Sequence, residues 1–416
     1  MQVAEITTLY RCLDKITPHK KALFSFLRQR WQTLFNAKFD VLLYDLTSTY
    51  FEVDVPISGQ RKFGYSRDKR PDCVQVVIAL IVTSDGFPVV YEVLSGNTSD
   101  KTTLKDFLER IESQYGKAHR VWVMDRGIPT EETLEEMRKA KTPVSYLVGT
   151  PKGRLTALEK KFLALSWEKA RESVDVKLLK ENDEIYILAR SHGRVTKERQ
   201  MRIRKLRNLF SRLKELQKQS LSRDNLLLKV GAAKKEAGRV YGLVDIKLPD
   251  KDEAVSPHTF VFRINRQKLR VTRRREGHYL LRSNLKSAEP GELWKYYIQL
   301  TEIEQAFKEM KNDLAIRPIY HQSDERIEAH IFVAFLAYCL QVTLKNRTKA
   351  LAPGLSPRAI LEKFSTVQMV DVEIPTTDGR TLFLSRYTEP DDDVKLLLQK
   401  LDLHFPEQSL PKISAW

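Results

Sequence analysis

The order of the strands and helices expected in the first third of the chain restricts its fold most. Apolar runs rich in β-branched residues predict strands at residues 41–52, 74–82 and 87–94. A helix, a fourth strand at 120–125, a second helix and a fifth strand at 144–149 follow. Three consecutive strands followed by alternating helices and strands predict an α/β domain with a mixed sheet flanked by helices.

Two aspartates occupy notable places in this pattern. Asp45 lies inside the apolar first strand, and Asp125 ends the fourth. A carboxylate inside an apolar strand is costly to bury unless it is paired or bound to a metal ion. The strand order is that of a ribonuclease-H-like sheet, whose first and fourth strands are adjacent, so residues 80 apart in sequence (125 − 45) would become neighbours. Taken alone, Asp125 also fits a local turn hydrogen bond, because Gly127 follows it closely.

A third acid is expected on a helix predicted over residues 291–313. The candidates are Glu302, Glu304 and Glu309. Tyr297, Glu304 and Lys311 recur at a spacing of seven, which puts them on one face of a continuous helix. An acid between a phenol and an ammonium group suits the binding of a metal ion and a phosphate. A plain surface helix with ion pairs would give the same pattern.

Three converging carboxylates have a specific chemical use. Enzymes that cleave or transfer phosphodiesters use two divalent ions about 3.5–4 Å apart. Mg²⁺ prefers oxygen ligands, and carboxylates supply them. Asp45, Asp125 and Glu304 are therefore predicted to bind two Mg²⁺ ions, for which Mn²⁺ would substitute. The histidines and the three cysteines are dispersed and show no zinc or redox spacing.

The chain is strongly basic. It has 71 Lys and Arg against 54 Asp and Glu, a net charge of +17. Residues 195–240 hold 14 Lys and Arg and 4 Asp and Glu, a net of +10. An excess of one sign indicates a polyanionic partner, nucleic acid before an anionic membrane. A solvated helix face is the alternative interpretation of such a charge run.

The basic segment also has helical periodicity. An apolar stripe recurs through it at Ile203, Leu206, Phe210, Leu213 and Leu216. The residues expected to contact DNA are Arg202, Arg204 and Lys205.

Membrane insertion and export are not expected. The longest apolar stretches, residues 74–82 and 331–340, are far shorter than the ~20 residues of a spanning helix. The N-terminus has no apolar signal core. A cytoplasmic location is predicted.

Six blocks of the sequence resemble, in the same order, blocks of bacterial insertion-sequence transposases of the large IS-four-type DDE class. The blocks are YDLTSTYFE, GYSRDKRPDCVQV, GFPVVYEVLSGNTSD, VMDRG, YYIQLTEIEQAFKEMK and RPIYHQSDERIEAHI. The first is similar to the branch with a LYDxTSTYFE-like block. The resemblance runs from about residue 8 to the C-terminal region.

The resemblance implies roles for particular residues. Asp45 matches the first metal-binding aspartate, Asp125 of VMDRG the second, and Glu304 the glutamate of a Tyr-x₂-Arg-x₃-Glu-x₆-Lys signature. Tyr297 and Lys311 match that signature and are expected to position phosphates. Leu300 stands where the signature has arginine. The candidates to replace that arginine on the DNA are Arg126, Lys308 and Arg317.

The resemblance also implies an organisation of the chain. It predicts an N-terminal helical segment (1–36), a catalytic core in two parts (37–149 and 289–347), an insertion subdomain (150–288) and a C-terminal region (348–416). The insertion would be mostly β with one basic helix. Because the match begins almost at Met1, either residues 1–36 and the insertion recognise the element's ends, or an N-terminal part is lacking.

The expected activity is cut-and-paste DNA transposition, in which DNA is cleaved at the element's ends and the freed 3′-hydroxyl is joined to a target. The expected partners are double-stranded DNA, as terminal inverted repeats and as target, and a second copy of the chain in a synaptic homodimer. Two alternatives are a ribonuclease-H-like nuclease without strand transfer, and a catalytically silent, truncated transposase that only binds DNA.

Overall fold

The computed structural model describes residues 5–52, 59–99, 104–115, 120–140, 143–150, 152–251, 253–285, 289–407, 410 and 412–414. The chain forms two compact units. Unit 1 comprises Met1–Val144 and Ile298–Trp416, and unit 2 comprises Ser145–Tyr297. Unit 2 therefore interrupts unit 1 in sequence.

The sheet of unit 1 has the predicted strand order. It contains β1 (Val41–Tyr50), β2 (Gln75–Thr83), β3 (Pro88–Ser95) and β4 (Val121–Met124), in the spatial order β3-β2-β1-β4. β2 pairs antiparallel with both β1 and β3, whereas β4 runs parallel to β1. Every residue of β2 is buried, so both faces of the sheet are covered. The ribonuclease-H-like mixed α/β fold is thus confirmed.

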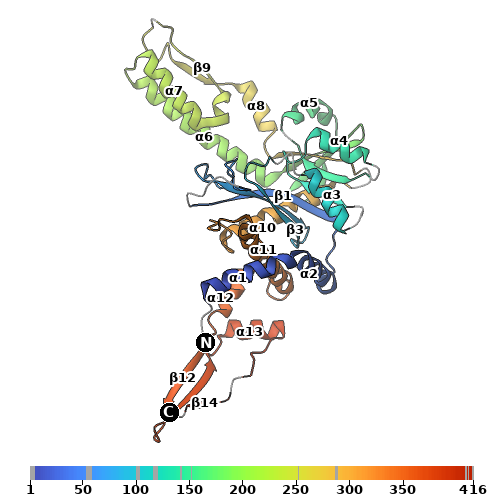
Figure 1. Cartoon of the computed structure of the whole chain (residues 1–416). Coiled ribbons are helices and arrows are strands. Elements are labelled where there is room, and N and C mark those ends of the chain that lie inside the picture. Colours follow the sequence, from blue (N-terminus) through green and yellow to red (C-terminus); the bar gives the residue numbers. More distant parts are fainter. Residues whose placement is uncertain are drawn as a thin grey trace. The chain divides into compact units, whose positions relative to one another are not determined.

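Helices flank this sheet (Figure 1). Those of unit 1 are α1 (Ile6–Ile16), α2 (Lys20–Phe35), α3 (Leu104–Tyr115), α4 (Glu131–Lys139), α10 (Leu300–Asn312), α11 (Asp324–Thr348), α12 (Pro357–Phe364) and α13 (Asp392–Leu401). The hydroxyl of Ser323 caps α11. By length and composition, α11 is the single described helix apolar enough to cross a membrane. It packs instead against α1, α2, α10 and β3, so core packing accounts for its apolar residues.

The helix predicted over residues 291–313 is not continuous. It is divided into α9 (Pro290–Ile298) and α10, with Gln299 between them. The hydroxyl of Thr301 donates to the carbonyl oxygen of Ile298 at 2.8 Å. Gln299 keeps right-handed helical backbone angles, with φ −66° and ψ −14°, so the interruption is confined to one residue. It falls between Tyr297 and Glu304, so of the three residues predicted to share one face of a continuous helix, only Glu304 and Lys311 lie on the same helix.

Unit 2 has a sheet and a helical arm. Its strands are β5 (Ser145–Gly149), β11 (His278–Ser283), β8 (Glu184–Ser191), β7 (Val174–Glu181) and β6 (Glu168–Arg171), antiparallel and in that spatial order. α5 (Lys152–Leu163) packs on β7 and β11. The arm consists of α6 (His192–Lys218), α7 (Arg223–Ala237), β9 (Val244–Lys247), β10 (Val261–Ile264) and α8 (Arg266–Arg274).

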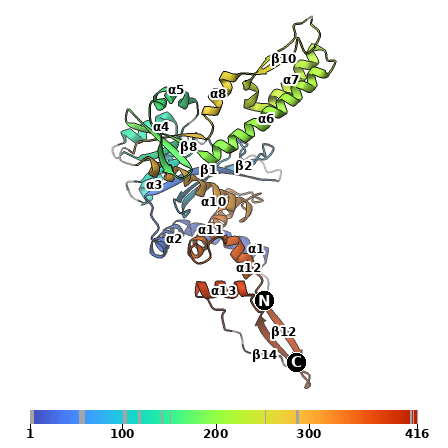
Figure 2. The ribbon, with the colours of Figure 1, turned by 180° about the vertical axis from the view of Figure 1, so that it is seen from behind.

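The arm has a hydrophobic core of its own. α6 and α7 lie side by side in both views (Figures 1 and 2). Leu206, Leu209 and Leu213 of α6 pack against Leu226 of α7 and against Phe260. The predicted basic helix is thus two helices. Helices occupy more of the described residues of 150–288 than strands do, so this segment is less β-rich than expected.

The C-terminal region contains a small sheet and a helix. β12 (Met369–Pro375), β13 (Thr381–Tyr387) and β14 (Lys412–Ser414) form the antiparallel sheet. The carboxylate of Asp391 accepts from the amide of Val394 at 2.8 Å and caps α13.

Candidate active site

The register of β1 and β4 places two aspartates side by side. Tyr44 of β1 and Met124 of β4 are partners in the parallel pair. Asp45 directly follows Tyr44 in the sequence, and Asp125 directly follows Met124. Because adjacent strands lie about 4.8 Å apart, the two residues are neighbours. Asp45 is half-buried, and Asp125 is exposed at the end of its strand.

The third predicted acid comes from α10. This helix contacts β1 and β2 and buries Ile303, Phe307 and Met310 among its inward residues. Glu304 follows Ile303 and is electrostatically coupled to the aspartates. Burial first, and then the negative charge of Asp125, raises the pKa of Glu304 above its usual value.

The electrostatic effect of the neighbouring carboxylates is also seen in the pKa of Asp45. Burial first, and then the charges of Asp125 and Glu304, raise the pKa of Asp45 to about 7. The amide of Leu46, which donates to the Asp45 carboxylate at 2.8 Å, opposes the rise in pKa, as does the Arg67 guanidinium. Three carboxylates thus act on one another from three elements of unit 1.

The other two glutamates on α10 are engaged elsewhere. Glu302 forms an ion pair with Lys345 of α11 at 2.9 Å. Glu309 is buried and accepts from the side-chain amide of Gln305 at 2.9 Å. Of the three candidates, Glu304 is therefore the one that faces the aspartates.

The donor set suits hard divalent cations. It consists of carboxylate oxygens whose mutual repulsion a cation would relieve, as the raised pKa values of Asp45 and Glu304 indicate. Among the described residues, no group of three or more His, Cys, Asp or Glu side chains is arranged so that it could hold a metal ion. The three acids are close enough to interact, but their oxygens do not converge on a single point.

An acidic residue that was not predicted lies beside this cluster. Asp68 accepts from the ammonium group of Lys311 at 2.8 Å and also forms an ion pair with Arg317. Lys311 and Arg317, both predicted to contact phosphate, are thus held by a protein carboxylate. The signal in the sequence was one acid inside the basic run SRDKR.

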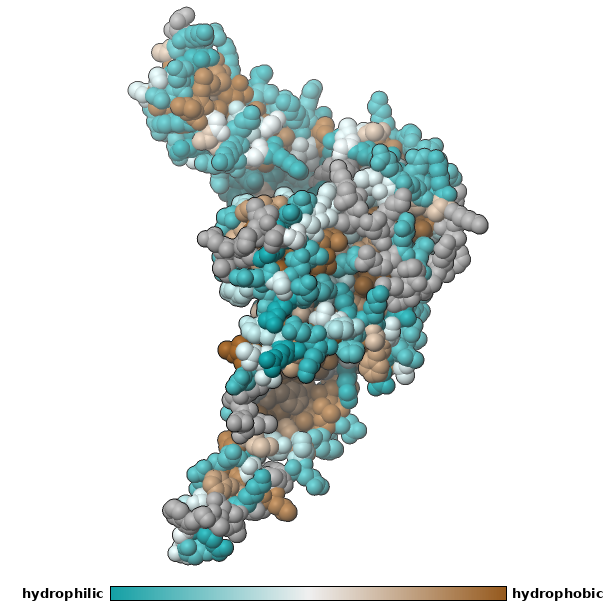
Figure 3. All heavy atoms as spheres, viewed as in Figure 1, coloured by the Kyte–Doolittle hydropathy of each residue, from teal (hydrophilic) through white to brown (hydrophobic). Residues whose placement is uncertain are grey.

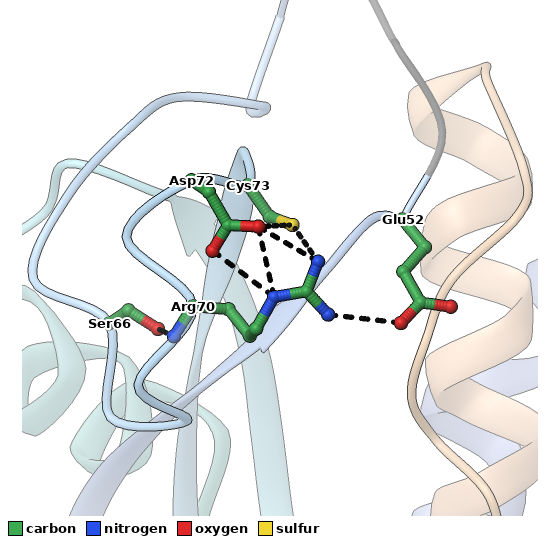
Figure 4. Close-up of polar contacts among 5 residues, drawn as sticks. All are labelled: Glu52, Ser66, Arg70, Asp72 and Cys73. Carbon is green, nitrogen blue, oxygen red and sulfur yellow. Dashed lines mark hydrogen bonds and ion pairs between the residues drawn. The ribbon is translucent and has the colours of Figure 1, made fainter.

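The loop that carries Asp68 is fixed at both ends (Figure 4). The Arg70 guanidinium binds both carboxylate oxygens of Asp72, at 2.9–3.1 Å, and reaches Glu52 at the end of β1 at 3.0 Å. The hydrogen bond from Arg70 lowers the pKa of the Asp72 carboxyl to about 2. The Ser66 hydroxyl accepts from the Arg70 amide at 3.0 Å. The loop 66–73 is therefore internally braced.

The remaining predicted DNA contacts divide by exposure. Arg126, Lys308, Arg204 and Lys205 are exposed. The prediction that Arg202 contacts DNA is wrong, because Arg202 is buried and its guanidinium pairs with Glu276 at 2.5 Å.

Tyr297, the other predicted contact, belongs to unit 2. Its ring lies 6.1 Å from that of Trp294 and 6.4 Å from that of Tyr279. Aromatic packing within unit 2 thus accounts for its position.

Comparisons with known proteins place the chain in a family. No curated protein matches it. A solved structure, the cryo-EM structure of the piggyBac transposase synaptic complex with hairpin DNA, is similar over 82% of this chain and 56% of that chain, with 7% identity and a TM-score of 0.40. The chain thus spans little more than half the length of that transposase. The family profile described as "Transposase DDE domain" matches residues 41–340, which include β1, β4 and α10. The chain belongs to the transposase DDE domain family.

Proposed function

We propose that this chain is a DNA transposase that cleaves phosphodiesters at the ends of a mobile element and joins the freed 3′-hydroxyl to target DNA. The observation that carries the proposal is the register of β1 and β4, which makes Asp45 and Asp125 neighbours, with Glu304 coupled to them. Family membership supports the same activity. Assignment to the IS-four-type class remains a prediction from the sequence blocks.

Asp45, Asp125 and Glu304 would hold two Mg²⁺ ions, with Mn²⁺ as a substitute. When bound, such ions activate the attacking oxygen and stabilise the leaving oxygen of a phosphodiester. The protein's part is to present carboxylate oxygens from two adjacent strands and a packed helix, which are rigid elements. With a pKa of about 7, Asp45 is protonated in part at neutral pH, so a bound cation would displace a proton.

DNA binding would draw on the exposed basic surface. Arg204 and Lys205 lie on α6, and hydrophilic residues cover much of the visible face of the arm (Figure 3). Contacts of this kind neutralise phosphates and weaken as salt rises. We further propose that the active form is a homodimer on paired element ends, located in the bacterial cytoplasm on the nucleoid.

The deciding experiment compares the wild type with Asp125→Asn on plasmid DNA carrying the element's ends. In Mg²⁺ the wild type should nick the DNA, whereas Asp125→Asn should bind it with at least equal affinity and lose cleavage. Asp85→Asn, in the exposed turn between β2 and β3, is the matched control and should cleave normally. Wild-type cleavage by Asp125→Asn would remove Asp125 from the mechanism.

Joining is tested separately. A duplex with a pre-cut 3′-hydroxyl end should be inserted into target DNA by the wild type. Cleavage without insertion would identify a nuclease. Binding without either reaction would identify a silent DNA-binding protein.

A further inference from the structure

The loop 66–73 makes polar contacts both with the strand that carries Asp45 and with the end of the helix that carries Glu304. On one side, the amide of Arg67 donates to the hydroxyl of Ser48 in β1 at 3.1 Å. On the other, Asp68 binds Lys311, which lies in the last turn of α10. The loop thus links two elements of the carboxylate cluster, although it contributes no acid to that cluster.

Asp68 is buried together with its partners. Its side chain is 5% exposed, and those of Lys311 and Arg317 are 11% and 27% exposed. Both cations bind the same oxygen, Oδ1, while Oδ2 is buried and has no hydrogen-bond partner among the described residues. Burial lowers the pKa of Lys311, and the carboxylate of Asp68 opposes this effect. Asp68 therefore helps to keep Lys311 charged in a poorly hydrated place.

Three cations lie around Asp68, because Arg67 and Arg317 both act electrostatically on Lys311. Arg67 also acts on Asp45, which places this cationic group beside the acid cluster. The Lys311 ammonium and the Arg317 guanidinium have more N–H donors than their contacts with Asp68 use, so they can also bind an oxygen of a second anion. A DNA phosphate is the anion that the neighbouring cluster would handle.

We propose that Asp68 is a positioning residue that fixes Lys311 and Arg317 as a phosphate seat for DNA beside Asp45, an inference that rests on the proposed function. The phosphate seat consists of Lys311, Arg317 and Arg67. Asp68 does not touch the DNA itself. It holds two flexible side chains where they would meet a phosphodiester oxygen, so that little side-chain entropy is lost on binding.

A simple charge effect predicts the opposite result. If Asp68 acted only as a negative charge near DNA, its neutralisation would tighten binding, because it would remove a repulsion. If it positions the cations, its neutralisation releases them and weakens binding. The sign of the change in affinity therefore separates the two roles.

The test is a double-mutant cycle with Asp68→Asn and Lys311→Gln in the full chain. The readout is the affinity for a short fluorescein-labelled DNA duplex without divalent ions, measured over a series of salt concentrations. Each single variant should bind about tenfold more weakly, the loss of one charge-assisted contact. The double variant should lose less affinity than the two single losses combined, because part of the effect of Asp68 acts through that lysine and the rest through Arg317. The salt slope of Lys311→Gln should fall by about 0.9.

Two controls protect this interpretation. Asp313→Asn removes an acid at the end of α10 that pairs with Arg358 at 3.2 Å, and it should leave DNA affinity unchanged. The thermal midpoint of each variant shows whether it is folded. Should Asp68→Asn fail to fold, Asp68→Glu replaces it in the cycle, since it keeps the charge and shifts it by one methylene. It should give a smaller loss of affinity, which is reduced further in the Lys311→Gln background.

Tighter or unchanged binding by folded Asp68→Asn, or additive losses in the double variant, would overturn the proposal. The cycle does not require cleavage, so its result stands apart from the test of the proposed function. If the wild type fails to nick DNA while the cycle shows coupling, the transposition proposal fails and the phosphate seat remains.

Discussion

The amide of Arg67 donates a hydrogen bond to the hydroxyl of Ser48 at 3.1 Å, three residues beyond Asp45 along β1. This bond fixes the start of the loop 66–73 against the strand that carries the first acid. The Arg67 guanidinium then lowers the pKa of Asp45, against the larger effect of burial. The position of the loop and the charge state of the acid are thus linked.

Ser48→Ala tests this link. Ser48 is 1% exposed, so loss of its hydroxyl leaves the Arg67 amide without its acceptor and should destabilise unit 1 by about 1–3 kcal/mol. Displacement of Arg67 should also raise the pKa of Asp45. Denaturant unfolding over a range of pH measures both effects. Ser385→Ala, which removes a hydroxyl from β13, is the control and should leave the pH dependence unchanged.

Asp45→Asn should stabilise the metal-free protein above neutral pH. The pKa of Asp45 is about 7 in the folded chain and near 4 when unfolded, so the folded state binds the extra proton between these values. Wild-type stability should therefore fall as pH rises from about 4 to 7, by at most about 4 kcal/mol, and then level off. The variant should lack this fall. Parallel pH profiles for the two proteins would contradict the assignment.

In the presence of Mg²⁺, the wild type should become more stable than Asp45→Asn. An ion that binds only the folded state stabilises it by about 2.7 kcal/mol at a hundredfold excess over its dissociation constant. Thermal midpoints with Mg²⁺ and after addition of EDTA should differ for the wild type, and much less for Asp45→Asn or Glu304→Gln. An equal Mg²⁺ response in all three proteins would place the ion elsewhere.

Leu213→Ala should unfold the arm without affecting the acid cluster. Leu213 is fully buried between α6 and α7, and its truncation should cost about 2–5 kcal/mol. Hydrogen exchange in α6 and α7 should accelerate, while the Mg²⁺ response of unit 1 stays the same. Loss of that response would show that the arm core and the acid cluster unfold together.

Neighbouring arginines on α6 should behave in different ways. Arg204→Gln removes an exposed charge and should reduce the salt slope of DNA binding by about 0.9, with little change in stability. Arg202→Gln leaves the buried carboxylate of Glu276 with only its longer ion pair to Arg199, at 3.8 Å, so it should destabilise unit 2 by about 3–5 kcal/mol. Similar effects from both changes would contradict the burial of Arg202.

The part of the site that sequence could predict was the part set by strand order. The alternation of strands and helices implied that the first and fourth strands are adjacent, and the register of Tyr44 with Met124 makes Asp45 and Asp125 neighbours. Glu304 was chosen from its spacing with Tyr297 and Lys311 and from the resemblance to the family signature. The tertiary partners of Glu302 and Glu309, which spacing does not encode, support that choice.

What the sequence could not predict depends on distant contacts. Asp68 meets Lys311 and Arg317 across 243 and 249 residues, and no local pattern encodes such a pair. The apolar stripe on α6 was expected to include Ile203, which is 38% exposed, whereas Arg202 is buried against Glu276, 74 residues away. The interruption at Gln299 affects a single residue, which helical periodicity does not register.

The interruption of unit 1 by unit 2 sets a timetable for synthesis. Asp125 leaves the ribosome 179 residues (304 − 125) before Glu304. At about 5–20 residues per second, that delay is roughly 10–35 seconds. A nascent polypeptide therefore carries two of the three carboxylates during this delay. A product that ends before α10 cannot complete the cluster.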